Sequence, residues 1–200
     1  MCFCIYIVNC KVLICCVTGH RPEGFPFPRE QDCFAYMEYQ RILSREIEIL
    51  LRGGYRDFIS GMARGADMDF AHEVIKFRDE EGFISLEAAL AYPCYPSKRK
   101  TNDAAKRDDL IAQCNLRTEI SSHYHRGCMQ KRNRYMVDKA DIVFAIWNGK
   151  KAGGTWDTIQ YARQKKKDIR YLMLTGIPCE PFMETVKIIY DEKQTKALMA

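Results

Sequence analysis

Short apolar runs alternate along this chain with longer segments whose apolar residues recur at helical spacing. Glycine, proline or polar turn residues bound the runs, which is typical of strands buried on both faces of a parallel sheet. The expected strands cover residues 12–17, 58–59, 85–92, 117–121, 141–147 and 169–174. The expected helices cover residues 31–52, 65–81, 102–114, 129–139 and 153–166. This alternation predicts an α/β fold with a doubly wound, mostly parallel sheet of about six strands and helices on both faces.

The length of 200 residues suits one domain, and no internal repeat divides it. We expect the alternating segment, residues 12–176, to form that domain. Residues 1–11 are then an N-terminal extension with no assigned role, and residues 177–200 are a C-terminal tail that either adds a small terminal element or stays partly mobile. No apolar run is long enough to span a membrane, and no basic segment and cleavage site frame a secretory signal. The sequence therefore predicts a cytoplasmic protein with no membrane partner.

The chain has ten cysteines, of which five crowd the first sixteen residues and five are scattered singly. A zinc site needs paired C-x-x-C spacings or cysteine–histidine pairs. The closest spacing here, Cys2-x-Cys4, is weak evidence for such a site. We therefore expect reduced, buried thiols and no metal site.

The net charge of +5 is concentrated in one segment. Residues 97–139 hold eleven Lys or Arg and five Asp or Glu, whereas the rest of the chain holds twenty basic and twenty-one acidic residues. Such a concentration suits a phosphate-bearing ligand. It is equally compatible with a solvated helix face, so the charge alone does not decide between the two.

Candidate binding residues follow the expected strands, where ligands of open parallel sheets bind. Thr18, Gly19, His20 and Arg21 come directly after the first strand. Gly19 permits a tight turn and close backbone approach, and the other three side chains can donate hydrogen bonds to phosphate or ribose.

The end of the second strand carries Gly61, Arg64, Gly65 and Asp67 ahead of a helix. Flexible glycines and a helix N-terminus together make an anion site, although the dinucleotide fingerprint G-x-G-x-x-G is absent. Asp67 either accepts a hydrogen bond from a ribose hydroxyl or caps the helix.

Two later segments complete the candidate site. Arg132 and Asn133 lie early in a helix, and Gly153, Gly154 and Thr155 open another one after a buried strand. The glycine pair and the helix start would place amides toward a phosphate. Arg132 and Arg134 cannot both face the cleft, since residues two apart on a helix point about 200° from each other.

These motifs resemble a known superfamily. Residues 60–67 (SGMARGAD) with Ala71-His72 resemble the signature of the DNA-processing protein A (Smf) family. The rest resembles more closely the YpsA-like branch of the Smf/DprA–LOG (SLOG) superfamily. The supporting residues are 17–22 (VTGHRP), the Pro93 loop, 132–138 (RNRYMVD), 140–141, and 153–155 ahead of 159–162 (IQYA). The motifs run in the expected order from residue 12 to about residue 174.

The resemblance implies a Rossmann-like fold that binds a nucleotide-type ligand, with no one reaction and no required cofactor. The superfamily includes DNA-binding proteins, LOG-type phosphoribohydrolases and nucleotide sensors. LOG-type enzymes use an Arg and the Glu of a Gly-Thr-x-x-Glu segment at an N-glycosidic bond. Arg132 is similar to that Arg, but Thr158 stands where the Glu should be, and Asp157 lies one residue early, about 100° away around a helix. Arg132 and Asp157 are therefore the candidate catalytic residues if the chain is an enzyme, which the sequence leaves open.

Three functional hypotheses follow. The favoured one is a sensor or regulatory protein that binds an ADP-ribose-like, NAD-like or nucleoside-monophosphate ligand at the carboxyl ends of the sheet. The second is a LOG-type phosphoribohydrolase, and the third is a DNA-binding protein. Nucleic acid is the less favoured partner because aromatic residues are sparse in the basic segment and the isoelectric point is only about 8.6. Dimers are frequent in the superfamily, so the resemblance also suggests a homodimer.

Overall fold

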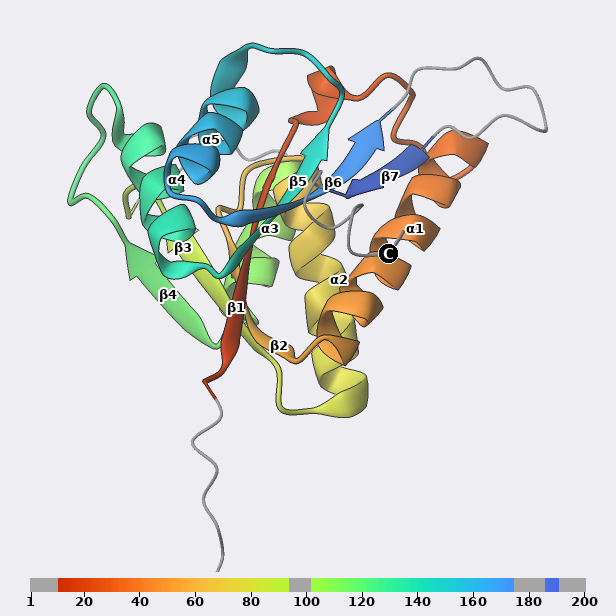
Figure 1. Cartoon of the computed structure of the whole chain (residues 1–200), viewed down its shortest axis with the longest axis horizontal. Helices are drawn as coiled ribbons and strands as arrows, with labels where there is room; N and C mark the ends of the chain where they lie inside the picture. Colours follow the sequence, from red (N-terminus) through yellow and green to blue (C-terminus); the bar gives the residue numbers. More distant parts are fainter. Residues whose placement is uncertain (1–10, 94–101, 175–185, 191–200) are drawn as a thin grey trace, which may run out of the picture.

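The computed structural model describes residues 11–93, 102–174 and 186–190. Strands and helices alternate along the chain (Figure 1). The strands are β1 (Leu13–Gly19), β2 (Tyr55–Ser60), β3 (Ser85–Leu90), β4 (Leu116–Glu119), β5 (Ile142–Trp147), β6 (Asp168–Leu174) and β7 (Val186–Tyr190). The helices are α1 (Phe34–Arg52), α2 (Ala66–Glu81), α3 (Asn102–Ala112), α4 (Cys128–Lys139) and α5 (Gly153–Gln164), with a 3-10 turn at Pro22–Gly24.

The strands form one sheet in the order β4-β3-β2-β1-β5-β6-β7. The first six strands are parallel, and β7 pairs antiparallel to β6 with Leu174 opposite Val186. From β1 the chain builds the sheet outward in one direction to β4, then returns to the other side of β1 with β5. The carboxyl ends of β1 and β5 therefore form the switch point, where a ligand crevice is expected.

The predicted doubly wound α/β fold is confirmed, with each of the six expected strands present in the sheet. The sequence did not identify β7, which lies within residues 177–200, the segment interpreted as a tail. It adds an antiparallel edge strand to an otherwise parallel sheet, which is a frequent arrangement in doubly wound folds.

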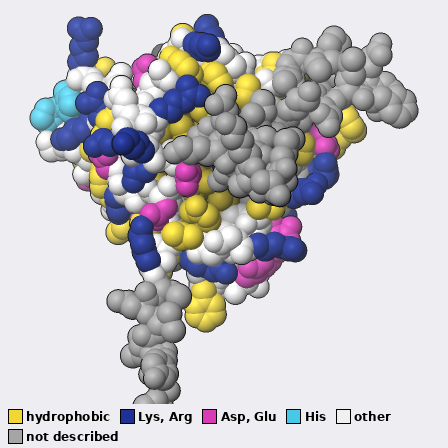
Figure 2. Space-filling model, in the orientation of Figure 1, with side chains coloured by type: hydrophobic (Ala, Val, Ile, Leu, Met, Phe, Trp, Pro, Cys, Tyr) yellow, Lys and Arg dark blue, Asp and Glu magenta, His cyan; other side chains and the backbone are white. Residues whose placement is uncertain are grey.

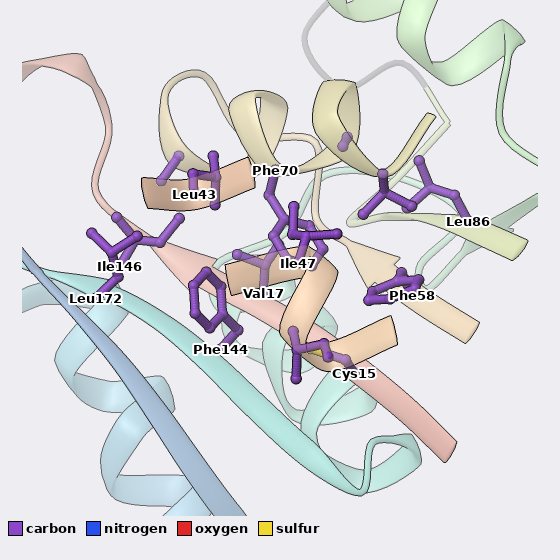
Figure 3. Packing of buried hydrophobic residues seen from close by; sticks show 14 of the residues in the cluster. Cys15, Val17, Leu43, Ile47, Phe58, Phe70, Leu86, Phe144, Ile146 and Leu172 are labelled. Atoms are coloured by element: carbon purple, nitrogen blue, oxygen red, sulfur yellow. The ribbon is translucent and has the colours of Figure 1, made fainter. Parts of the chain in front are cut away.

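Helices cover both faces of the sheet, with α1 and α2 on one side and α4 and α5 on the other (Figure 1). Two core clusters result, and neighbouring residues of one strand enter different clusters because strand side chains alternate. Cys15 packs in the α1/α2 cluster and Cys16 in the α4/α5 cluster, both with no exposed surface. Figure 3 shows side chains of β1, β2, β3, β5 and β6 pointing toward α1 and α2 in the first cluster.

Helix α1 shows how an apolar stripe in the sequence packs a helix onto the sheet. Its buried positions recur three or four residues apart and form one apolar stripe: Tyr36, Tyr39, Leu43, Ile47 and Leu50. The helix ends where the Gly53 amide donates to the Ile49 carbonyl at 2.9 Å and Gly54 adopts a φ of +88°.

A buried ion pair connects helix α1 to strand β6. Arg170 on β6 donates through Nε to Glu46 on α1, and the two residues are only 7% and 3% exposed. Removing one charge of such a pair leaves the other charge desolvated, which is costly.

Among the helices of the described residues, none has the length and apolar character that a membrane span requires.

Candidate functional site

A cavity of about 650 Å³ opens at the switch point, outside the carboxyl ends of β1 and β5. Its walls come from the loops after those two strands, from the first turns of α2 and α5, and from one face of α4. The lining residues that carry polar side chains are Thr18, His20, Arg21, Glu23, Asp67, Arg132, Asn133, Asn148, Lys150 and Thr155. The lining is therefore mixed, and the cavity lies where open parallel sheets bind ligands.

Ten of the thirteen binding residues expected from the sequence line this cavity: Thr18, Gly19, His20, Arg21, Asp67, Arg132, Asn133, Gly153, Gly154 and Thr155. The other three, Gly61, Arg64 and Gly65, do not. Segments separated by more than a hundred residues in sequence thus converge on one place.

The two glycines outside the lining allow neighbouring segments to approach closely. The Gly61 carbonyl accepts a hydrogen bond from Nη1 of Arg132, and a Cβ on Gly61 would overlap that guanidinium. Gly65 has a φ of +93°, and its Cβ would lie 2.6 Å from the His20 carbonyl oxygen. Both glycines therefore shape the walls and do not face the ligand space.

Arg64 is held at the surface by acidic side chains. It forms ion pairs with Glu23 at 2.7 Å and with Asp103 at 3.4 Å. Arg64 does not line the cavity and pairs with Glu23, which does, so its part in ligand binding stays a prediction.

The start of α5 presents free amides to the cavity. The preceding residue, Ala152, gives no side-chain cap, and Gly153 has a φ of +83°. The amides of Gly153, Gly154 and Thr155 donate no hydrogen bond to any residue the structure describes. The Thr155 hydroxyl donates to the Gly19 carbonyl at 2.9 Å, which fixes this turn against β1. Free amides at a helix N-terminus form an anion site.

The sequence predicts an anion site at the start of α2, but in the structure this turn carries its own acidic side chain. Its first amide, on Ala66, donates to the His20 carbonyl at 3.1 Å. The Asp67 carboxylate lies in the first turn and accepts from the Ala63 amide at 3.3 Å through Oδ2. An aspartate there already complements the helix dipole, so this turn offers negative charge to the cavity.

Arg132 supplies a buried positive charge. Its side chain is 6% exposed, and its Nε atom is buried without a hydrogen-bond partner in the described structure. Arg134 points elsewhere, with its guanidinium carbon 5.4 Å from the centre of the Tyr161 ring. The prediction that only one of the two arginines faces the cleft is confirmed.

Two further cations, Arg21 and Lys150, stand at the mouth of the cavity. Both are exposed, and neither forms an ion pair with any described residue. Together with Arg132 they outnumber the two lining carboxylates, of which Glu23 is already paired with Arg64. The cavity therefore has a positive balance, which favours an anionic ligand.

Asp67 is a buried acid on the wall facing Arg132. Its side chain is 7% exposed, and Oδ2 lies 3.8 Å from Nη1 of Arg132. Its other oxygen, Oδ1, has no hydrogen-bond partner among the residues described. Burial raises the pKa of Asp67 to about 6, although the nearby Arg132 charge acts in the opposite direction.

His20 also lines the cavity. Its Nε2 atom is buried without a hydrogen-bond partner in the described part of the chain. Burial lowers the pKa of His20, although the neighbouring Asn148 side chain acts in the opposite direction, so the imidazole is neutral near pH 7.

The proposed catalytic pairing of Arg132 with Asp157 is not formed. Asp157 is exposed and lines a separate pocket of about 270 Å³ between α4 and α5. Thr158 is buried, donates to the Gly154 carbonyl at 2.7 Å and accepts from Asn133 at 2.8 Å. Asp157 therefore lies on the side of α5 that borders this second pocket, away from the cavity that Arg132 lines.

Asn148 and Lys150 were not identified from the sequence. The Asn148 side chain donates to the Gly24 carbonyl at 2.8 Å and accepts from the Lys150 amide at 3.0 Å, so it joins the loops after β1 and β5. An Asn-Gly pair directly after a buried strand was the available signal, since Asn and Gly favour turns.

The basic segment contributes less free charge than its composition suggests. Arg117 pairs with Glu119 at 2.7 Å and Lys139 with Glu87 at 2.8 Å. Residues 97–101, which hold three of its cations, lie outside the described residues. In Figure 2, Lys and Arg side chains gather on the side of the molecule where α4 and α5 lie.

Within the described residues no group of three or more His, Cys, Asp or Glu side chains is arranged to hold a metal ion. The cysteines seen there are free thiols: Cys15, Cys16, Cys33, Cys114 and Cys128.

A family model described as the YspA SLOG family matches residues 15–176. Among curated proteins, none matches the chain. A similar solved structure is that of DNA processing protein A (DprA) from Streptococcus pneumoniae, with 13% sequence identity and a TM-score of 0.50. The match covers 79% of this chain and 49% of that protein, so the chain spans about half of its length. At this identity the likeness supports the fold.

Proposed function

Because the chain belongs to the YspA SLOG family, we propose that it binds a nucleotide-derived small molecule in the cavity at the carboxyl ends of β1 and β5 and acts as a sensor or regulatory protein. Family membership supports a nucleotide-related or DNA-processing role in general terms. The observation that carries the finer proposal is the convergence of the free α5 amides with Arg21, Arg132 and Lys150 in one cavity.

The anion site at the start of α5 would bind a phosphate group of the ligand. Free amides at a helix N-terminus favour negative charge, and two of the three cations are unpaired. A volume of about 650 Å³ lies within the range of small-molecule sites and exceeds what inorganic phosphate alone requires.

The remaining polar groups suit the rest of a nucleotide. Asp67 Oδ1 can accept hydrogen bonds from sugar hydroxyls, and the His20 side chain lines the same cavity. ADP-ribose, NAD and nucleoside monophosphates each combine a phosphate with such groups, so they are the ligand classes to test.

The first experiment is native mass spectrometry of the purified chain, in which a co-purified nucleotide would appear as a mass adduct. The second is thermal unfolding with ADP-ribose, NAD and AMP. A ligand that fits should raise the melting temperature, and Gly154→Arg should abolish the rise by filling the anion site.

A matched pair of charge reversals tests the anion site more finely. Lys150→Glu should reduce the ligand-induced rise, because Lys150 lines the cavity. Lys151→Glu is the control, since the neighbouring Lys151 is exposed and does not line it. No response of the wild-type chain to any nucleotide, or equal responses of the two variants, would contradict the proposal.

DNA binding remains the alternative that the basic segment allows. It requires affinity for an oligonucleotide that falls steeply as salt concentration rises. A flat salt response would remove this alternative.

A further inference from the structure

The structure has a further cavity, of about 450 Å³, between α1, α2 and α3. We propose that it binds a zwitterionic dipeptide with apolar side chains. The inference goes beyond the proposed function, because no described residue lines both this cavity and the one at β1 and β5. Binding at either site can therefore be tested without the other.

Helix α3 runs beside α2 in the same direction. Near their starts, Arg64 pairs with Asp103 at 3.4 Å. Near their ends, Nη1 of Arg78 donates to the Gln113 carbonyl at 2.5 Å. Residues early in one helix therefore lie level with residues early in the other, so the cavity between them has two ends whose charges can be compared.

The end nearer the helix starts carries an uncompensated positive charge. Arg29 lines it from the loop before α1, and its Nη2 atom donates to Oδ1 of Asp69 and neutralises that carboxylate. Nη1 of Arg29 donates to none of the described residues and is not enclosed by protein. Lys106, early in α3, is exposed and forms no ion pair with any residue that the structure describes. A carboxylate at this end would meet both Lys106 and the open nitrogen of Arg29.

The other end carries an uncompensated negative charge. Glu73, one turn after Asp69 on α2, is 13% exposed, and the neighbouring His72 side chain holds the pKa of Glu73 below its ordinary value. Because His72 lies only 3.7 Å from Glu73, this acid already has a counter-ion when the histidine is protonated. Asp109 on α3 also lines the cavity, is exposed and has no ion-pair partner in the described part of the chain. It would attract an ammonium group.

The spacing of the two ends matches a dipeptide. Lys106 and Asp109 are three residues apart on α3, and Asp69 and Glu73 are four apart on α2. These spacings separate the two ends by about 4.5 to 6 Å along the helix axes, whereas an extended dipeptide spans about 6 to 7 Å. A ligand with a single charge would leave one end without a partner, so the arrangement favours a zwitterion.

The remaining lining residues suit apolar side chains and a peptide group. Leu43 on α1, Met68 on α2 and Leu110 on α3 provide apolar surface from three sides. Gln40 and Gln113 carry amide groups, which can donate to and accept from a peptide bond. The volume lies within the range of small-molecule sites, so the ligand's side chains have room.

Isothermal titration calorimetry of the full-length chain tests which parts of the ligand are recognised. Leucyl-leucine should bind at least about tenfold more tightly than N-acetyl-leucyl-leucine, which lacks the ammonium group, and than leucyl-leucine amide, which lacks the carboxylate. δ-Aminovaleric acid keeps the charge spacing without side chains or a peptide group, and it should also bind at least about tenfold more weakly. No binding of leucyl-leucine, or equal binding of any of the other three compounds, would overturn the proposal.

Matched substitutions test the position of the site. Lys106→Ala and Asp109→Asn should each weaken leucyl-leucine binding by about tenfold. Both side chains are exposed, so the circular dichroism spectrum should stay that of the wild type. Lys151→Ala and Asp157→Asn are the controls and should bind as the wild type does, because these exposed residues do not line the cavity. Unchanged affinity in Lys106→Ala and Asp109→Asn, or an equal loss in the controls, would overturn the assignment.

Discussion

The substitution Asp67→Asn should change how the stability of the protein depends on pH, whether or not the chain is an enzyme. The folded state raises the pKa of this carboxyl from its ordinary value of 3.8 to about 6 because burial disfavours the charged form. The folded state therefore holds a proton up to about pH 6, whereas the unfolded chain releases it near pH 4. Stability is lost as pH rises through this window, because ionisation then favours the unfolded state.

The size of the effect follows from the shift. A difference of about two pKa units corresponds to about 3 kcal/mol, at 1.36 kcal/mol per unit. The unfolding free energy of the wild type, relative to that of Asp67→Asn, should therefore fall by about 3 kcal/mol between pH 4 and pH 7. Other titrating groups contribute to both proteins, so they largely cancel in the difference.

Urea denaturation followed by circular dichroism measures the two unfolding free energies at each pH. The difference should be largest in favour of the wild type near pH 4 and should decline most steeply between pH 4 and pH 6. A difference that stays constant across this range would show that the Asp67 environment is not desolvated as the structure describes. A difference that rises with pH would mean that the Arg132 charge dominates over burial.

Two further substitutions test the packing around the site and the core. Gly61→Ala should displace the Arg132 guanidinium and abolish the ligand-induced rise in melting temperature, whereas Gly82→Ala, with open space around it, should cost some stability and keep the ligand response. Glu46→Gln should lower the unfolding free energy by about 3 kcal/mol in urea denaturation by removing the charge that faces Arg170, and a loss below about 1 kcal/mol would contradict that role for the ion pair.

Much of the fold could be predicted because its signals are local. Most of the parallel strands contain a short apolar run between turn residues, and each helix has its own periodicity. The strand β7 was not predicted because an edge strand is defined by pairing with β6, a partner outside its own segment.

The candidate site could also be predicted only in part, where the reasoning stayed within one helix or one strand end. Helical rotation correctly separated Arg132 from Arg134, because that reasoning needs one helix only. It could not show that Asp67 and Arg132 lie 3.8 Å apart, since they belong to α2 and α4 on opposite faces of the sheet. The same limit applies to Asp157, whose distance from Arg132 depends on how α5 packs against α4. The sequence shows which residue types follow each strand. The role of each residue depends on its contacts with other helices and strands, which the sequence does not show.

The adjacent cysteines of β1 provide chemical reporters for the two halves of the molecule. Cys15 lies beneath α1 and α2, and Cys16 lies beneath α4 and α5. Burial raises the pKa of both thiols, that of Cys16 to about 12, so alkylating reagents meet an unreactive, inaccessible thiol in the native state. Each thiol becomes reactive when its own helical layer opens. Pulsed alkylation with peptide mapping of these neighbouring positions can therefore distinguish the order in which the two layers separate from the sheet.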